Sequence, residues 1–129
     1  MNKIFVEVSI GELLDKISIL EIKREKIKNA EKLSFVSEEY NTLKDYLNKS
    51  IDLDTEIKKY FSDLKKVNLK LWVIEDEIRI CEKSSDFGKK FIELARNVYF
   101  FNDERAKIKL DINKHTGSKI VEVKDYVDY

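Results

Sequence analysis

The sequence contains no proline and only three glycines among its 129 residues. Proline breaks the interior of an α-helix and glycine weakens it, so their scarcity favours long, uninterrupted helices. There is also a single cysteine, Cys81, which excludes an internal disulfide. Cys81 falls on an apolar helical stripe, where a small side chain suits a core. We interpret it as core filler and not as a reactive thiol.

An excess of charge of one sign is also missing. Lysine plus arginine and aspartate plus glutamate number 25 each, so the formal net charge at pH 7 is zero. Binding to nucleic acid or to an anionic membrane through bulk charge requires a positive surface. The chain has no apolar run near the roughly 18 residues of a membrane span, and its start lacks a secretory signal. We therefore expect a cytoplasmic protein that has no nucleic-acid partner and no membrane partner.

Residues for metal or nucleophilic chemistry are scarce. His115 is the only histidine, and with Asp111 it has the i, i+4 spacing of metal ligands on a helix. Two ligands do not make a site, and no Glu-x-x-His pair is present for a di-iron bundle. One histidine and one cysteine far apart in sequence give no recognisable catalytic dyad or triad. The sequence predicts no metal site and no cofactor, and it leaves open whether the protein is an enzyme.

The strongest pattern that is present runs from Leu53 to Cys81, where apolar residues recur in steps of three and four. This alternation is typical of the seam of a coiled-coil helix, here on the order of 45 Å long. The same helix has a second apolar side, made by Phe61, Leu69, Trp72, Val73 and Ile80. A helix that is apolar on two sides needs neighbours on two sides. We expect it to lie centrally in a bundle or to contact another subunit.

Three further helices are predicted from apolar periodicity, over about residues 10–28, 31–49 and 87–115. Residues 3–8 and 119–124 alternate apolar and polar side chains and predict short β-like segments, which would pair with each other or with a second subunit. The predicted fold is all-α: an antiparallel coiled-coil-like bundle of about four helices in two hairpins, the second one long. We expect residues 1–129 to form a single domain.

Residues suited to capping lie at the expected helix ends. Ser9 and Asp52 are the predicted N-caps of the first and third helices, and Ser85 or Asp86 that of the fourth. Gly117 is the predicted C-cap of the fourth helix, because glycine adopts the left-handed conformation that ends many helices. These signals place the helix boundaries independently of the apolar pattern.

Charge supports a hairpin between the last two helices. Residues 75–82 are mainly acidic and residues 89–96 mainly basic, so antiparallel packing would bring opposite charges together. Around this hairpin, together with Asn68 and Asp103, lie the candidate ligand-binding residues: Trp72, Glu75, Asp76, Arg79, Arg96, Tyr99, Asn102 and Arg105.

Two interpretations of these polar residues stay open. In the first they line a pocket in which two arginines, Arg96 and Arg105, bind a small anionic ligand and are oriented by Glu75 or Asp76. In the second they form an ion-pair network that fixes the register of the helices, as is common in charged helical hairpins. We favour the second interpretation on the sequence alone.

Several stretches carry a resemblance to a known family: VEVSIGELLDKISILEIK (6–23), LWVIEDEIR (71–79), DFG (86–88), FIELARNVY (91–99), Asn102-Asp103, and Gly117-Ser118 with Glu122. In these the chain resembles, over nearly its full length, a family of short bacterial and phage proteins catalogued as a domain of unknown function. The resemblance implies no assigned chemistry. It implies a setting near surface-glycan genes, and its pattern includes the polar residues of the last two helices.

The function predicted from these observations is that of a helical binding or scaffolding protein. We expect it to form a homo-oligomer, to which a protein partner could also bind. The family resemblance adds a surface-glycan biosynthesis context. The alternative is a small enzyme or sensor that binds an anionic metabolite or sugar phosphate between the last two helices. A small anionic ligand is thus the partner that separates the two hypotheses.

Overall fold

The computed structural model describes residues 3–129, which form four helices. They are α1 (Ile10–Lys26), α2 (Ala30–Ser50), α3 (Thr55–Lys83) and α4 (Lys89–Thr116). The predicted all-α bundle is confirmed. The long helix α3 continues without a break through its 29 residues, as the absence of proline and of internal glycine predicts.

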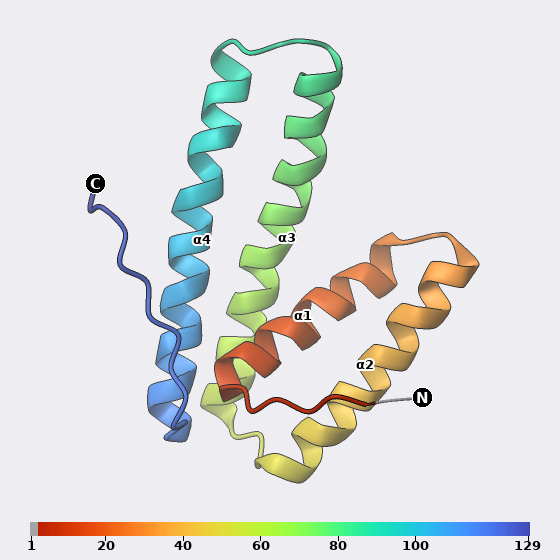
Figure 1. Cartoon of the computed structure of the whole chain (residues 1–129), viewed down its shortest axis with the longest axis vertical. Coiled ribbons are helices and arrows are strands. Elements are labelled where there is room, and N and C mark those ends of the chain that lie inside the picture. Colours follow the sequence, from red (N-terminus) through yellow and green to blue (C-terminus); the bar gives the residue numbers. More distant parts are fainter. Residues whose placement is uncertain (1–2) are drawn as a thin grey trace.

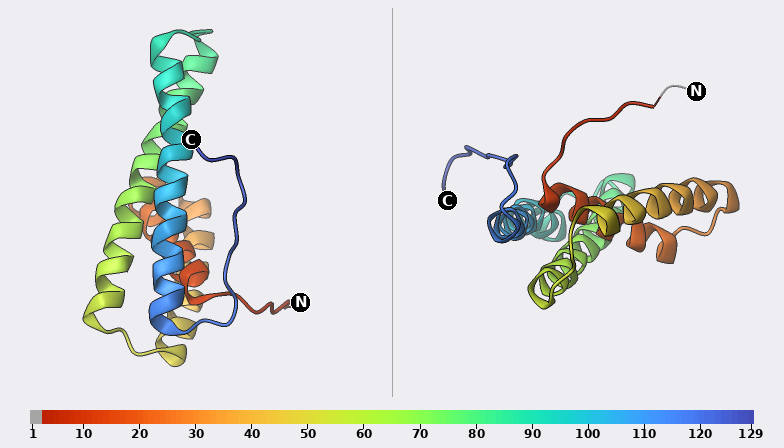
Figure 2. Two further views of the ribbon diagram at one scale, coloured as in Figure 1. Left: turned by 90° about the vertical axis from the view of Figure 1, so that its left-hand side faces the viewer. Right: turned by 90° about the horizontal axis from the view of Figure 1, so that it is seen from below.

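The four helices form two hairpins of unequal length (Figure 1). Helices α3 and α4 run antiparallel along the long axis, and α1 crosses the lower half of this pair before α2 returns beside α1. Helix α1 contacts all three other helices. The upper part of the α3–α4 pair, residues 71–101, extends beyond α1 and α2 (Figures 1 and 2). We call it the distal hairpin, and the opposite part the basal end.

Side-chain caps explain where three of the helices begin. The hydroxyl of Ser9 accepts a hydrogen bond from the backbone N–H of Glu12 at 3.1 Å, which confirms the predicted N-cap of α1. The cap of α3 is Asp54 and not Asp52, because it is Asp54 whose carboxylate accepts from the N–H of Ile57 at 2.8 Å. Asn29 caps α2 in the same way.

The turn between α3 and α4 differs from the prediction. Helix α4 begins at Lys89 and has Gly88 at its N-cap position, so neither Ser85 nor Asp86 caps it. Instead, the carboxylate of Asp86 accepts a hydrogen bond from the N–H of Gly88 and closes the turn. At the other end of α4, the left-handed Gly117 (φ 66°) is the predicted C-cap.

The core consists of two separate apolar clusters along the seam of α3. The basal cluster joins all four helices and contains Leu14, Ile17, Leu47, Ile57, Leu64 and Ile112. The distal cluster contains three buried residues, Ile74, Cys81 and Leu94, so Cys81 is core filler as predicted. On the second apolar side of α3, Phe61 packs against the basal cluster, whereas Val73 and Ile80 are 47% and 60% exposed.

The two terminal segments are extended but form no strand within residues 3–129, which corrects the prediction for 3–8 and 119–124. The two segments extend away from the helices and diverge from each other (Figure 2). Near the N-terminus the Phe5 ring packs edge-on against Tyr46 of α2, while the C-terminal segment runs back along α4 (Figure 1). Because the two segments do not meet, they cannot pair with each other as strands. A two-stranded ribbon would in any case be only marginally stable in water.

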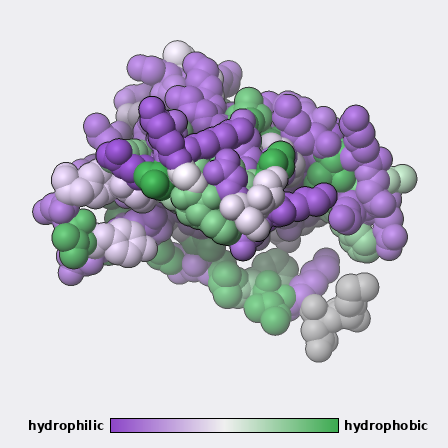
Figure 3. All heavy atoms as spheres, turned by 90° about the horizontal axis from the view of Figure 1, so that it is seen from above, coloured by the Kyte–Doolittle hydropathy of each residue, from purple (hydrophilic) through white to green (hydrophobic). Residues whose placement is uncertain are grey.

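The face of the molecule seen from above is predominantly hydrophilic (Figure 3). Figure 3, which looks onto the molecule from above, shows apolar side chains as separate groups on a mainly hydrophilic face. None of the helices within residues 3–129 combines the length and the apolar character needed to cross a bilayer.

Candidate functional site

A buried carboxylate joins three helices at the basal end. Asp15 of α1 is 1% exposed and accepts hydrogen bonds from Nε of Arg105 on α4 and Nδ2 of Asn68 on α3, both at 2.9 Å. A second guanidinium nitrogen of Arg105 also donates to Asp15, so the arginine binds it with two parallel bonds. Asn68 donates further to the hydroxyl of Ser18 at 2.8 Å. We call these four residues the polar cluster.

Gly11 allows α1 to come close enough to α4 for this cluster to form. A Cβ atom at Gly11 would lie 2.6 Å from the backbone oxygen of Lys109 and 2.9 Å from Oδ1 of Asn113. That same Oδ1 accepts a hydrogen bond from the N–H of Gly11 at 2.8 Å. The close contact occurs one helical turn before Asp15, so it fixes where the carboxylate meets α4.

Lys109 extends the charged region by one turn of α4. Its side chain is 8% exposed, and its Nζ lies 2.7 Å from Oε2 of Glu12 and 2.6 Å from Oε2 of Glu122. Burial acts to lower the pKa of Lys109, but the hydrogen bonds to both glutamates outweigh it and the pKa is raised. Glu12 therefore has two roles. Its carboxylate pairs with Lys109 of α4, and its backbone N–H donates to the Ser9 cap of α1.

Arg105 and Lys109 form a cationic pair surrounded by three carboxylates. The hydrogen bond to Asp15 is the main cause that raises the pKa of Arg105, and Glu12 and Glu122 add to it. In turn the hydrogen bond from Lys109 lowers the pKa of Glu122, and the charge of Arg105 contributes. Asp15 and Lys109 are the buried charged residues of the described chain. Placing a charge in a protein interior costs several kcal/mol unless it is paired and hydrogen-bonded.

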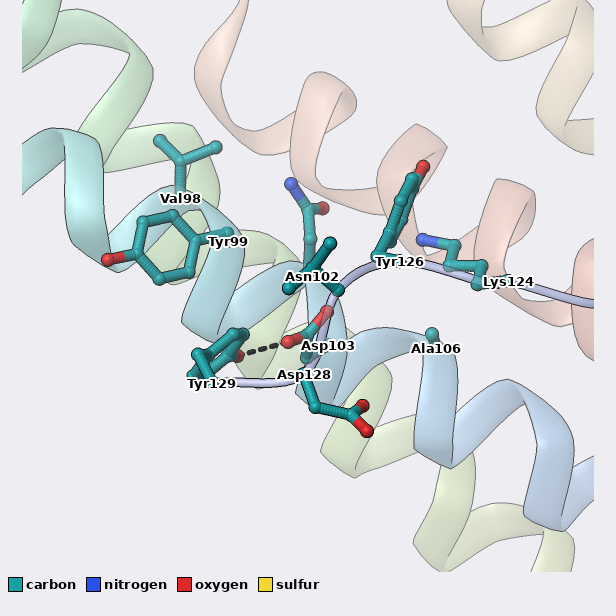
Figure 4. Close-up of a pocket in the computed structure, with 10 residues that line it drawn as sticks. Val98, Tyr99, Asn102, Asp103, Ala106, Lys124, Tyr126, Asp128 and Tyr129 are labelled. Carbon is teal, nitrogen blue, oxygen red and sulfur yellow. Dashed lines mark hydrogen bonds between the residues drawn. The ribbon is translucent and has the colours of Figure 1, made fainter.

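A cavity lies between α4 and the C-terminal segment, and its lining includes Ala106, the residue that follows Arg105 (Figure 4). Its volume is about 1040 Å³. Tyr129 closes one end, because its hydroxyl donates to the carboxylate of Asp103 and its ring packs 5.3 Å from that of Tyr99. The bond to Asp103 raises the pKa of Tyr129 to about 12. The lining residues are Val98, Tyr99, Asn102, Asp103, Ala106, Lys124, Tyr126, Val127, Asp128 and Tyr129.

The candidate residues predicted on α4 lie in three different surroundings. Arg105 enters the polar cluster, and its partner is Asp15 of α1 in place of the expected Glu75 or Asp76. Tyr99 and Asn102 line the cavity under the C-terminal segment. The guanidinium of Arg96 lies over the ring of Phe100 at 5.6 Å, outside both.

The candidate residues predicted on α3 stay apart from the polar cluster. Trp72 is half-buried, Asp76 is exposed, and Glu75 pairs with Arg79 one turn along the same exposed face at 2.7 Å. Within the described chain no ion pair joins residues 75–82 to residues 89–96, so the expected charge pairing across the hairpin is not formed. The helices meet through their apolar seam, and the charged side chains flank it in water.

Sequence reasoning missed most of the residues that meet at the basal end: Glu12, Asp15, Ser18, Lys109 and Glu122. One signal for part of this set is present. Gly11, Asp15 and Ser18 follow one another at spacings of four and three, so they form a line along one side of α1. A small residue followed by polar ones along such a line indicates a close helix contact with buried hydrogen bonds.

No three His, Cys, Asp or Glu side chains in the described part of the chain gather in a way that could hold a metal ion. Each cation at the basal end is instead paired with carboxylates: Arg105 with Asp15, and Lys109 with Glu12 and Glu122. An external charged group could bind here by replacing one of these partners.

The chain belongs to a family of unknown function, DUF6165, whose family model matches residues 4–128. The resemblance carried by the stretches from Val6 to Glu122 is thereby confirmed. No curated protein and no solved structure matches the chain.

Proposed function

We propose that the protein is a helical binding and scaffolding module that works as a homo-oligomer and assembles through its distal hairpin. The observation that supports this most directly is the set of apolar side chains left open on two helices that have no third helix beside them. Val73 and Ile80 of α3 are exposed, as are Phe87 in the turn and Ile92 of α4.

A two-helix hairpin can bury only the seam between its helices. At the basal end α1 and α2 supply the missing neighbours, but they do not reach the distal hairpin (Figure 1). Two copies packed side by side would make a four-helix bundle, which is the simplest arrangement that covers both helices. Such a pairing would be two-fold symmetric, with the same surface used by each copy.

The charges of the distal hairpin favour the same arrangement. Residues 75–82 of α3 are mainly acidic and residues 89–96 of α4 mainly basic, and the two blocks do not pair within the chain. In a two-fold dimer α3 of one copy would lie beside α4 of the other, so unlike charges would face each other. This complementarity selects the register, although each exposed pair contributes only about 0.2–1 kcal/mol.

Sedimentation or light scattering across a range of concentrations tests the proposal. We expect the wild-type protein to be a dimer or larger, and the double variant Val73→Lys/Ile80→Lys to be a folded monomer. Val127→Lys is the matched control, since Val127 is exposed on the C-terminal segment and outside the distal hairpin. A wild-type monomer at high micromolar concentration would contradict the proposal, and so would a double variant that assembles like the wild type.

The setting of this assembly is inferred from the family resemblance. Because that resemblance implies proximity to surface-glycan genes, we expect protein partners to belong to surface-glycan biosynthesis. The alternative function, a small enzyme or sensor for an anionic metabolite or sugar phosphate, retains Arg105 as a ligand-binding residue. It needs a second cation other than Arg96, which lies over the ring of Phe100.

A further inference from the structure

We infer that Arg105 and Lys109 form a binding site for the phosphate group of a small molecule, and that Glu122 occupies this site as a resident carboxylate. The site lies at the basal end and does not depend on the assembly through the distal hairpin. The ligand would displace Glu122 and, with it, the C-terminal segment that Glu122 holds against α4.

The contact between Lys109 and Glu122 joins an enclosed group to an open one. Lys109 is almost fully buried, whereas Glu122 is 39% exposed and belongs to a segment without helix or strand. Every residue from 119 to 129 is exposed, so little apolar burial holds this segment in place. A salt bridge between such partners is the contact most readily exchanged for one to an external anion.

Arg105 has capacity for a further acceptor. Its Nε and Nη2 atoms donate to Asp15, and its Nη1 atom makes no hydrogen bond within residues 3–129. The side chain is 28% exposed, so part of it is open to solvent. Its charge also acts on Glu122, which shows that the carboxylate lies within electrostatic reach of both cations.

The attachment of α1 to α4 does not require Glu122. Asp15 already neutralises Arg105, and Glu12 already neutralises Lys109 at 2.7 Å. Glu122 is therefore a third carboxylate on two cations, supplied by a segment outside the four helices. A buried ion pair is weak evidence for stability, because apolar residues of similar volume would often serve as well. A binding site gives these charges a reason to be retained.

Glu122 is attached to the protein through its own chain, and this attachment determines which class of ligand can displace it. A tethered group competes at an effective concentration on the order of millimolar, so a free carboxylate of equal strength would displace it poorly. A phosphate monoester carries a charge of roughly −2 and three acceptor oxygens, enough to reach Lys109 and the free edge of Arg105 together. Once the segment has moved, the side of the neighbouring cavity that α4 forms, with Asn102 and Ala106, is the surface left for the rest of such a molecule.

Titration of the full-length protein with inorganic phosphate, followed by amide NMR, tests the inference. We expect shifts at Arg105 and Lys109, and binding by Glu122→Gln that is about tenfold tighter because the competing closed state is weakened. Lys109→Met should abolish binding. Lys107→Met is the matched control, since Lys107 is an exposed lysine two residues away on the same helix.

A second readout follows the C-terminal segment. Phosphate should move the amide signals of residues 120–129 in the wild type towards those of an unfolded peptide, as Glu122→Gln does without phosphate. The inference is overturned if Glu122→Gln binds phosphate no more tightly than the wild type, or if Lys107→Met loses as much affinity as Lys109→Met. Because Glu122→Gln alters an exposed residue, it decides the question even if Lys109→Met does not fold.

Discussion

The basal end and the distal hairpin share α3 and α4 but are stabilised differently. At the basal end all four helices contribute to one apolar cluster, and a buried carboxylate links α1 to both long helices. In the distal hairpin two helices share a cluster of three buried residues, and its one ion pair, between Glu75 and Arg79, lies on the surface along α3. The comparison shows that a continuous seam does not give uniform packing.

The number of neighbours accounts for this difference. The seam of α3 is covered by α1 and α4 at the basal end, but by α4 alone beyond the polar cluster. Regions with few buried contacts open more readily than the rest of a protein, so the distal hairpin should fray first. The same shortage of contacts leaves apolar side chains of the distal hairpin exposed, whereas the side chains of the basal cluster are enclosed by all four helices.

Paired leucine truncations should separate the two regions most strongly. Leu64→Ala removes a side chain that is fully enclosed in the basal cluster, and we expect a loss of about 4–5 kcal/mol in unfolding free energy. Leu94→Ala in the distal cluster should cost about 2 kcal/mol, because a two-helix seam can close around the gap or admit water. Urea denaturation measures both. Equal losses would show that the regions are equally well packed.

Removing the buried carboxylate is expected to have the next largest effect. Asp15→Ala leaves Arg105 without its acceptor and removes one of the two acceptors of Asn68, and breaking a buried charge pair typically costs about 3–5 kcal/mol. We expect the lower end of that range, since Arg105 is partly exposed. Asp76→Ala, an exposed acid of the distal hairpin, should change stability by less than about 0.5 kcal/mol. A similar loss of unfolding free energy in both variants would show that the polar cluster does not stabilise the fold.

Two glycine substitutions test how closely the helices approach. Gly11→Ala would press a Cβ against the backbone oxygen of Lys109, which cannot move without shifting α4, so we expect a loss of about 1–3 kcal/mol. At Gly88, in the turn of the distal hairpin, the new Cβ would meet only a carboxylate oxygen of Asp86 at 3.4 Å. Gly88→Ala should therefore be nearly neutral. Thermal unfolding compares the two variants. An unchanged unfolding temperature for Gly11→Ala would show that α1 can move away from α4 to accommodate the new Cβ.

The sequence predicts the helices well because periodicity and capping are local properties. The seam of α3, the Ser9 cap and the Gly117 cap are each set by residues within a turn of one another. Asp52 and Asp54 are equally good caps by residue type. The sequence pattern places the start of a helix only to within about two residues, so it does not distinguish between them. The terminal segments alternate like strands, but a strand also needs a partner, which alternation does not provide.

The polar cluster was not predictable in the same way, because its members are far apart in sequence. Periodicity shows which face of a helix is buried, but it does not show which faces meet. The sequence marks Arg105 as a candidate ligand-binding residue, yet its partner Asp15 lies 90 residues away on a helix whose crossing of α3 and α4 no local pattern specifies. Glu122 was missed for the same reason, since its contact with Lys109 depends on the path of the C-terminal segment.

The smallest predicted effect is a pH dependence that belongs to the basal end alone. His115 near the end of α4 lies 2.9 Å from Asp54 and 3.1 Å from Glu56, both at the start of α3. The hydrogen bond to Asp54 raises the pKa of His115 above 6.5, against the opposing effect of desolvation, and the charge of Glu56 adds to it. The folded protein therefore binds a proton more tightly than the unfolded chain does.

It follows that this contribution to stability is complete below pH 6.5 and is lost as the pH rises through the higher pKa of the folded state. The urea midpoint of the wild type should fall slightly between about pH 6 and pH 8, by little because the pair is open to solvent. His115→Gln should flatten this dependence, and no histidine lies in the distal hairpin to replace it. An unchanged decline in His115→Gln would assign the pH dependence to another group and separate it from the contact between α3 and α4.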